Sequence, residues 1–215
     1  MDALWPSVCG GCGVHGAGRL CGACRRRDLT RLPIAVQGLR GCWVLAPYDS
    51  GLGAALKQAK ARGDSGLGQE VASLFAIRAA TTVIQADFTA IIPAPSTPWS
   101  RFKRGFSLAA VLAETLSATT SVPVNHALTR RHGSRQVGLD RAGRLANLAH
   151  RVRADVPLSG RVLLIDDVLT TGATADTCVR ELLGTGASEV WLAVVCRANT
   201  YKAKRDPLTL AAAAW

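Results

Sequence analysis

Apolar positions along the chain fall into two alternating patterns. The unbroken apolar run at residues 162–165 and the mostly apolar runs at residues 42–48, 88–92 and 189–196 predict strands, and unbroken runs are typical of strands buried on both faces of a parallel sheet. Between these runs, apolar residues recur at three- and four-residue spacing, which predicts amphipathic helices. The helical sets are Leu52, Leu56 and Ala59; Leu67, Val71, Leu74 and Phe75; Leu108, Val111, Leu112 and Leu116; and Ala175, Cys178, Val179, Leu182 and Leu183. Alternating strands and helices predict an α/β fold with a mostly parallel sheet.

The apolar run at residues 162–165 is followed directly by two acids. Asp166 and Asp167 fall where a parallel strand ends, and open α/β sheets bind ligands just beyond the carboxyl ends of their strands. Ionised carboxylates accept hydrogen bonds without donating, so a vicinal diol or a hydrated Mg²⁺ ion is a natural partner. The strand end therefore predicts a sugar or cation site.

The turn after the acids has the composition of a phosphate site: Thr170, Thr171, Gly172, Ala173 and Thr174. The threonines supply hydroxyl donors, and the glycine permits a turn whose N–H groups converge on an anion at the positive end of the next helix. Helix capping is the alternative, but a cap accounts for only one or two of these residues. We therefore interpret the stretch as adjoining sugar and phosphate sites.

Four cysteines near the N-terminus form two hooks. Cys9, Cys12, Cys21 and Cys24 make two C-x2-C pairs with a glycine-rich stretch between them. Such hooks can arrange four thiolates as a tetrahedron, and His15 is a weaker ligand candidate. Disulfides are the alternative, but the lack of a secretion signal indicates reducing surroundings. We predict a structural zinc knuckle.

The other three cysteines have no partner at a metal-binding spacing. Cys42, Cys178 and Cys196 lie within or beside apolar runs. Free cysteine is among the most buried residue types. We predict that these three are buried core residues and not reactive thiols.

The formal net charge of +11 is concentrated in two segments. Residues 1–45 hold six Arg and two Asp, a charge of +4, and residues 129–153 hold seven Arg and one Asp, a charge of +6. Localised positive patches attract polyphosphates and nucleic acids alike. Aromatic residues make up only 5% of the chain, which gives few rings for stacking single-stranded bases. The charge pattern indicates an anionic partner and leaves its class open.

Length and composition set the outer limits of the interpretation. A chain of 215 residues that is 48% hydrophobic and 19% charged is typical of one folded domain, with room for a small appendage. No apolar run approaches the length needed to span a bilayer, and residues 1–5 lack a basic start with an apolar core. We therefore expect no membrane span and a cytoplasmic location.

The acid pair and the threonine turn belong to a stretch that resembles a known family signature. IDDVLTTGAT at residues 165–174 resembles the phosphoribosyl pyrophosphate signature of type I phosphoribosyltransferases. The whole chain resembles the ComF family of competence and GntX-like proteins, with IPAP at residues 92–95 and RGFS at residues 104–107 as supporting matches. The resemblance implies a sheet of the type I phosphoribosyltransferase kind.

The same resemblance implies a domain division and partners. Residues 1–40 would form the zinc-binding knuckle, residues 41–200 a phosphoribosyltransferase-like domain and residues 201–215 a C-terminal tail. The ligands would be phosphoribosyl pyrophosphate with Mg²⁺. Single-stranded DNA, a component of the competence machinery and a second copy of the chain are the other partners to be considered.

The resemblance also assigns roles to individual residues. Asp166 and Asp167 would hold the ribose and Mg²⁺, while residues 170–174 would hold the 5′-phosphate. The pyrophosphate would lie at the loop after residues 88–92, with the contacts Arg101, Lys103, Arg104 and Gly105. Lys57 and Lys60 match basic positions of the family, although charge at a helix C-terminus explains them equally well.

The arginine-rich stretch at residues 130–153 lies where the resemblance implies a mobile loop that closes over the substrate. Arg144 would then bring a cation to the leaving pyrophosphate. A linker is the alternative, because long loops within a compact domain are either functional or disordered.

Three functions remain open at this point. The first is transfer of a phosphoribosyl group to a nitrogen acceptor with release of pyrophosphate. The second is a non-catalytic DNA-uptake factor that binds single-stranded DNA, and the third is a nucleotide-sensing regulator without turnover. An intact acid pair fits all three functions and does not separate them.

Overall fold

The computed structural model describes residues 8–16, 18–96, 105–130 and 152–198. Its centre is a five-stranded sheet in the order β1-β2-β7-β6-β3. The bounds of these strands are β1 Thr30–Leu32, β2 Leu39–Pro47, β3 Ala90–Pro93, β6 Arg161–Leu169 and β7 Glu189–Arg197. The strands β2, β7, β6 and β3 are parallel, and β1 adds an antiparallel edge. The predicted α/β class with a mostly parallel sheet is confirmed.

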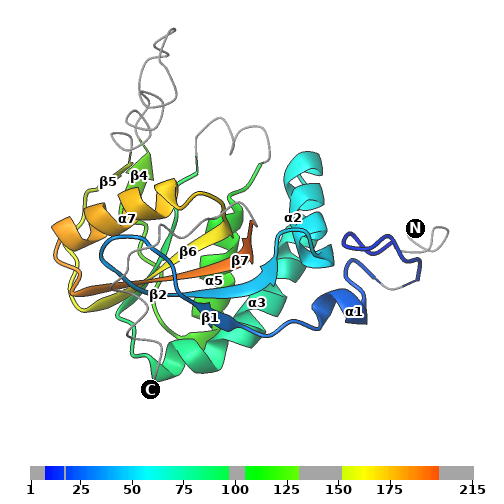
Figure 1. The fold of residues 1–215 in the computed structure, drawn as a ribbon, viewed down its shortest axis with the longest axis horizontal. Helices are drawn as coiled ribbons and strands as arrows, with labels where there is room; N and C mark the ends of the chain where they lie inside the picture. The colour runs from blue at the N-terminus through cyan, green and yellow to red at the C-terminus, as the bar shows by residue number, and fades with distance from the viewer. Residues whose placement is uncertain (1–7, 17, 97–104, 131–151, 199–215) are drawn as a thin grey trace, which may run out of the picture.

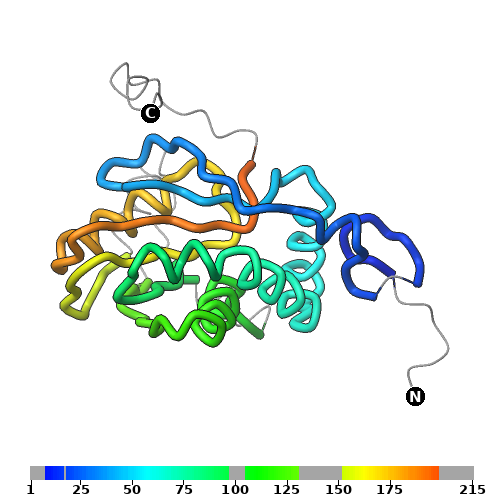
Figure 2. Tube along the Cα trace, turned by 90° about the horizontal axis from the view of Figure 1, so that it is seen from below, coloured from blue at the N-terminus to red at the C-terminus, as the bar shows by residue number. Residues whose placement is uncertain are grey.

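Helices cover both faces of this sheet (Figures 1 and 2). The bounds are α2 Gly51–Arg62, α3 Ser65–Gln85, α5 Leu108–Thr120 and α7 Ala173–Gly184. Along β6, Leu163 and Ile165 enter the core beneath α2, α3 and α5, while Val162 and Leu164 enter the core beneath α7. Successive strand residues point to opposite faces, so an unbroken apolar run fills both cores.

The N-terminal segment lies against the helices at one end of the sheet. The short helix α1 (Gly22–Arg25) follows the second cysteine hook. Cys9, Leu20, Cys21 and Cys24 are buried in the same core as α2 and α3. β1, which pairs with β2, links this segment to the sheet. The division at residue 40 stays a prediction.

A second, two-stranded sheet stands apart from the first. β4 (Leu128–Arg130) pairs antiparallel with β5 (Val152–Ala154), and Arg130 lies opposite Val152. Residues 130 and 152, the last and first described residues on either side of a gap, therefore lie side by side. The stretch at residues 131–151, which includes the lid candidate Arg144, lies outside the described residues.

Most predicted elements occur with shifted ends. The apolar run at 162–165 lies inside a longer strand, because pairing with β7 continues to Leu169 opposite Arg197. The acid pair therefore belongs to the strand itself. The three cysteines predicted to be core residues, Cys42, Cys178 and Cys196, are all buried. Among the described residues, no helix is both long and apolar enough to cross a membrane.

Candidate functional site

The acid pair lies near the carboxyl end of β6 and is already engaged by a lysine. Asp166 accepts a hydrogen bond at its Oδ1 from the backbone N–H of Asp167, at 2.8 Å. Asp167 Oδ1 lies 2.7 Å from Nζ of Lys60, which comes from the last turn of α2. The Lys60 and Asp167 side chains are 28% and 16% exposed. Within the described part of the chain, Asp167 therefore has an ion-pair partner in contact and Asp166 has none.

The environment of Asp166 opposes its ionisation. Burial of the carboxyl and the nearby charge of Asp167 raise the pKa of Asp166 to about 7, although the Asp167 N–H, Lys60 and Arg130 act in the opposite direction. Desolvation and a like charge both disfavour a second carboxylate. A diol or cation at this position would therefore favour an ionised state that the free protein resists.

The predicted phosphate turn joins β6 to α7. Gly172 is the N-cap of α7 with φ 80° and ψ −5°, and as a glycine it makes no side-chain capping bond of its own. The left-handed backbone explains the glycine, because other L-residues adopt it at a cost. Thr170, Thr171 and Thr174 are exposed. Thr171 Oγ1 accepts a 3.4 Å hydrogen bond from the Ala173 N–H, and the three threonine side chains remain accessible to a ligand.

A cavity of about 480 Å³ lies beyond the end of the neighbouring strand β3. Its walls are residues 93–96, the start of α5 and residues 126 and 128–130. Ser96 Oγ and Ser107 Oγ lie 2.7 Å apart inside it. Nε of Arg130 is buried without a hydrogen-bond partner in the described part of the chain. A buried guanidinium nitrogen with an unmet donor suits an anion.

The loop predicted to hold pyrophosphate is described only at its two ends. Its start is fixed beside the acid pair, because the Ala94 N–H donates to the carbonyl of Ile165 at 2.8 Å. Gly105, at its end, has φ 77°, and Ser107 is the N-cap of α5. The candidates Arg101, Lys103 and Arg104 lie outside the described residues.

The four N-terminal cysteines form a single cluster. Their sulfurs all lie within 4.8 Å of one another. Sulfurs around tetrahedral zinc are about 3.8 Å apart, so the cluster is close to the size that a zinc ion requires. N–H groups of Gly11 and Cys21 donate to Cys9 Sγ at 3.4 and 3.3 Å. Burial acts to raise the pKa of Cys9, but backbone N–H groups lower that pKa to about 6. The cluster thus suits a metal that binds thiolates, and His15 is not one of its members.

Two site residues were not assigned from the sequence. The sequence allows Lys60 a ligand role and a helix-dipole role equally, and its contact with Asp167 joins positions that are far apart in the chain. The sequence places Arg130 at the start of the predicted lid, yet its charge acts on Asp166. By contrast, Lys57 is stacked over the Tyr48 ring at 4.3 Å. A sequence pattern cannot show which lysine of a helix reaches another strand.

With the geometry established, comparison with known proteins defines the class. The chain belongs to the phosphoribosyl transferase domain family, which it matches over residues 102–209, half of its length. The matched region contains the acid pair, the threonine turn and Arg130. The predicted phosphoribosyltransferase kind of fold is thereby confirmed.

Individual relatives bear out the resemblance to the ComF family. Competence protein F of Haemophilus influenzae is 32% identical over 115 residues, which cover 51% of this chain and 50% of the relative. DNA utilization protein YhgH of Escherichia coli K12 is 34% identical over 104 residues, 46% of each chain. The chain thus spans about half the length of the curated relatives it matches.

Solved structures show distant similarity. Purine phosphoribosyltransferase from Pyrococcus horikoshii aligns with a TM-score of 0.43 and 17% identity over 63% of this chain and 79% of that chain. A hypothetical protein from Neisseria gonorrhoeae with bound ppGpp aligns with a TM-score of 0.40 and 21% identity, over 66% and 73% of the two chains.

Proposed function

We propose that the chain binds phosphoribosyl pyrophosphate with Mg²⁺ and transfers the phosphoribosyl group to a nitrogen acceptor, releasing pyrophosphate. The observation that carries this proposal is the meeting of three features at one edge of the sheet. These are the acid pair of β6, the threonine turn before α7 and the cavity at Arg130, whose Nε has no partner among the described residues. They match the three parts of the ligand: a ribose diol, a 5′-phosphate and a pyrophosphate.

In this proposal each element performs a separate task. Asp166 and Asp167 accept hydrogen bonds from the ribose hydroxyls and fix the orientation of the ring. The hydroxyls and N–H groups of residues 170–174 bind the 5′-phosphate at the start of α7. Arg130 acts on the pyrophosphate end, where negative charge builds up as the anomeric bond breaks. The transition state is a positively charged ribosyl group, so no protein nucleophile is required.

Two metals belong to the proposal. Carboxylate oxygens of the acid pair are ligands that suit Mg²⁺, which would neutralise part of the pyrophosphate charge when it is bound. The four cysteine sulfurs suit structural zinc, and we predict about one zinc per chain. Elemental analysis of protein purified without chelator tests the second assignment, and an absence of metal would contradict it.

Calorimetry with phosphoribosyl pyrophosphate and Mg²⁺ tests the site. Replacing both acids, Asp166→Asn with Asp167→Asn, should abolish binding, because amides cannot replace two carboxylates as acceptors for a diol and a cation. Asp87→Asn, which removes an exposed acid outside the site, is the matched control and should bind as the parent does. Unchanged affinity in the double variant would refute the site assignment.

Turnover needs a separate measurement. Incubation with the same ligand and a panel of nitrogenous bases should release pyrophosphate with one base or base class, and the acid-pair double variant should release none. Binding without release from any base would instead support a nucleotide-sensing regulator. The acceptor is thereby identified by the reaction itself.

Binding of single-stranded DNA is a second candidate function. It is favoured by the names of the relatives, Competence protein F and DNA utilization protein YhgH, and by exposed Arg26 and Arg27 beside the cysteine cluster. A titration over a salt series should show log affinity falling linearly with log salt, with a smaller slope for Arg26→Ala with Arg27→Ala. A slope identical to that of the parent would exclude these two arginines from the interface.

A further inference from the structure

The cysteine cluster packs against the first turn of α2 without intervening space. A Cβ added at Gly51, the first residue of α2, would lie 2.6 Å from Cys24 Sγ. One added at Gly11 would lie 2.6 Å from the carbonyl oxygen of Gly51. Only glycine at both positions allows this approach. A change in the shape of the cluster is therefore passed directly to the start of α2.

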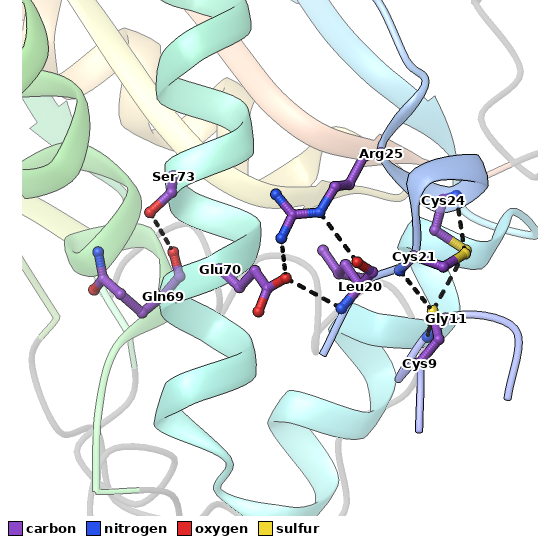
Figure 3. A network of polar contacts seen from close by, with 9 residues as sticks. All are labelled: Cys9, Gly11, Leu20, Cys21, Cys24, Arg25, Gln69, Glu70 and Ser73. Carbon is purple, nitrogen blue, oxygen red and sulfur yellow. Dashed lines mark hydrogen bonds and ion pairs between the residues drawn. The ribbon is translucent and has the colours of Figure 1, made fainter. Parts of the chain in front are cut away.

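The same N-terminal segment also holds the corner between α2 and α3. Arg19 Nη1 lies 3.0 and 3.1 Å from the two carboxylate oxygens of Asp64, the N-cap of α3. Glu70 of α3 accepts hydrogen bonds from the Leu20 N–H, at 3.1 Å, and from Arg25 (Figure 3). Residues 9–16 and 18–25, which we call the cysteine module, thus contact α2 at its start and just beyond its end.

Lys60 lies in the stretch of α2 between these two contacts. Its Nζ reaches Asp167 at 2.7 Å and forms the ion pair of the candidate site. An α-helix is stiff along its axis, at about 1.5 Å per residue, so its position is set by what holds its two ends. The cysteine module contacts the start of α2 and Asp64, the residue after its C-cap, so Lys60 moves with a helix that is fixed on both sides.

We propose that the metal-bound cysteine module is a brace that positions Lys60, and that it couples metal occupancy to ligand affinity at the acid pair. This rests on the proposed function, both for phosphoribosyl pyrophosphate at the acid pair and for zinc in the module. Without the brace, α2 shifts and Lys60 leaves Asp167. Two uncompensated carboxylates then face a highly anionic ligand, and affinity falls because like charges repel. Lys60 is here a positioning residue that acts through Asp167.

A double-mutant cycle tests the brace without altering a cysteine. Arg19→Ala removes the contact with Asp64 and should weaken phosphoribosyl pyrophosphate binding about 3- to 10-fold, within the range of a coupling free energy. In a Lys60→Met background, the same change should have no further effect. Arg40→Ala, which removes an arginine paired with Glu189 at the opposite end of the strands, is the matched control and should bind as the parent does. An equal loss of affinity in both backgrounds would overturn the proposal.

A measurement without ligand separates the brace from the proposed function. The rate at which an amine-reactive reagent labels Lys60, read by mass spectrometry, should rise in Arg19→Ala and after removal of metal by a chelator. The rate in Asp167→Asn sets the value for an unpaired lysine. Labelling that stays at the parental rate in Arg19→Ala would overturn the brace. If the parent binds no phosphoribosyl pyrophosphate, the proposed function fails while the labelling rates still decide the brace.

Discussion

At the scale of single residues, the site is a balance between two neighbouring carboxyl groups. Asp167 has Lys60 at 2.7 Å, whereas Asp166 has a backbone N–H and a raised pKa. The sequence pattern predicts that both acids belong to the site, but it does not predict that their environments differ. Unequal environments for adjacent acids arise from partners on other elements, which the local sequence does not specify.

The raised pKa of Asp166 makes stability depend on pH. Because the folded-state pKa of about 7 lies above the ordinary value of 3.8, the protonated form is favoured in the fold, and this contribution is lost as pH rises through about 7. The parent should therefore lose stability as the pH is raised from 5.5 to 8.5, and Asp166→Asn should not. The free energy of unfolding of the variant minus that of the parent should thus be larger at pH 8.5 than at pH 5.5, by on the order of 2 kcal/mol. Urea unfolding at both pH values measures the difference. A constant difference would contradict the raised pKa.

Lys60 and Lys57 provide a matched pair on one helix. Lys60→Met leaves Asp167 without its cation and should lower the free energy of unfolding by about 1 kcal/mol near pH 7.5. Lys57→Met removes the cation–π contact with Tyr48 and should cost about half of that. Denaturant unfolding of the two variants checks the order. Equal losses would mean that the ion pair contributes nothing specific.

At the scale of elements, periodicity predicted the strands and helices better than their ends. β6 includes both acids and ends at Leu169, because its pairing with β7 continues as far as Arg197. The sequence of one strand does not specify how far a distant strand will pair with it. The glycine of the phosphate turn was predicted from composition, and its φ of 80° supplies the reason for it. The cavity at Arg130 was not predicted, because it is formed by β3, α5 and β4 together.

Two glycines at the ends of α7 should respond oppositely to substitution. Gly172→Ala places a Cβ at φ 80° and should destabilise the protein by about 1 to 2 kcal/mol. Gly184 has open space for a Cβ in a helical position, so Gly184→Ala should be neutral or stabilise by about 0.5 kcal/mol. Thermal unfolding of both variants decides the signs. A stable Gly172→Ala variant would contradict the backbone of the turn.

At the scale of the whole molecule, the cysteine module and the sheet share one core. Cys9, Cys21 and Cys24 are buried together with Leu67 and Phe75 of α3. The sequence predicted the metal hooks from their spacing. It did not predict their attachment to α2 and α3, because the contacts of Arg19 and Glu70 join residues 45 and 50 positions apart.

This shared core predicts that metal removal will destabilise the entire domain. A strong chelator should lower the melting temperature by several degrees, because a loss of 1 kcal/mol corresponds to about 2–4 °C in a chain of this size. Calorimetric scanning with and without chelator measures the shift, and added zinc should restore the original transition. A melting temperature that does not respond to the chelator would show that the cluster is not metal-bound.

The strand order also sets the sequence of events during synthesis. Val44 of β2 lies opposite Val194 of β7, so the central strand pair cannot form until most of the chain has left the ribosome. The first and last cysteines of the two hooks, Cys9 and Cys24, are only 15 positions apart in the sequence. Short loops close quickly and at low entropic cost. Metal capture by the nascent chain can therefore precede sheet formation. If the cluster binds zinc, a shortage of that metal would act on this protein at an early step of its folding.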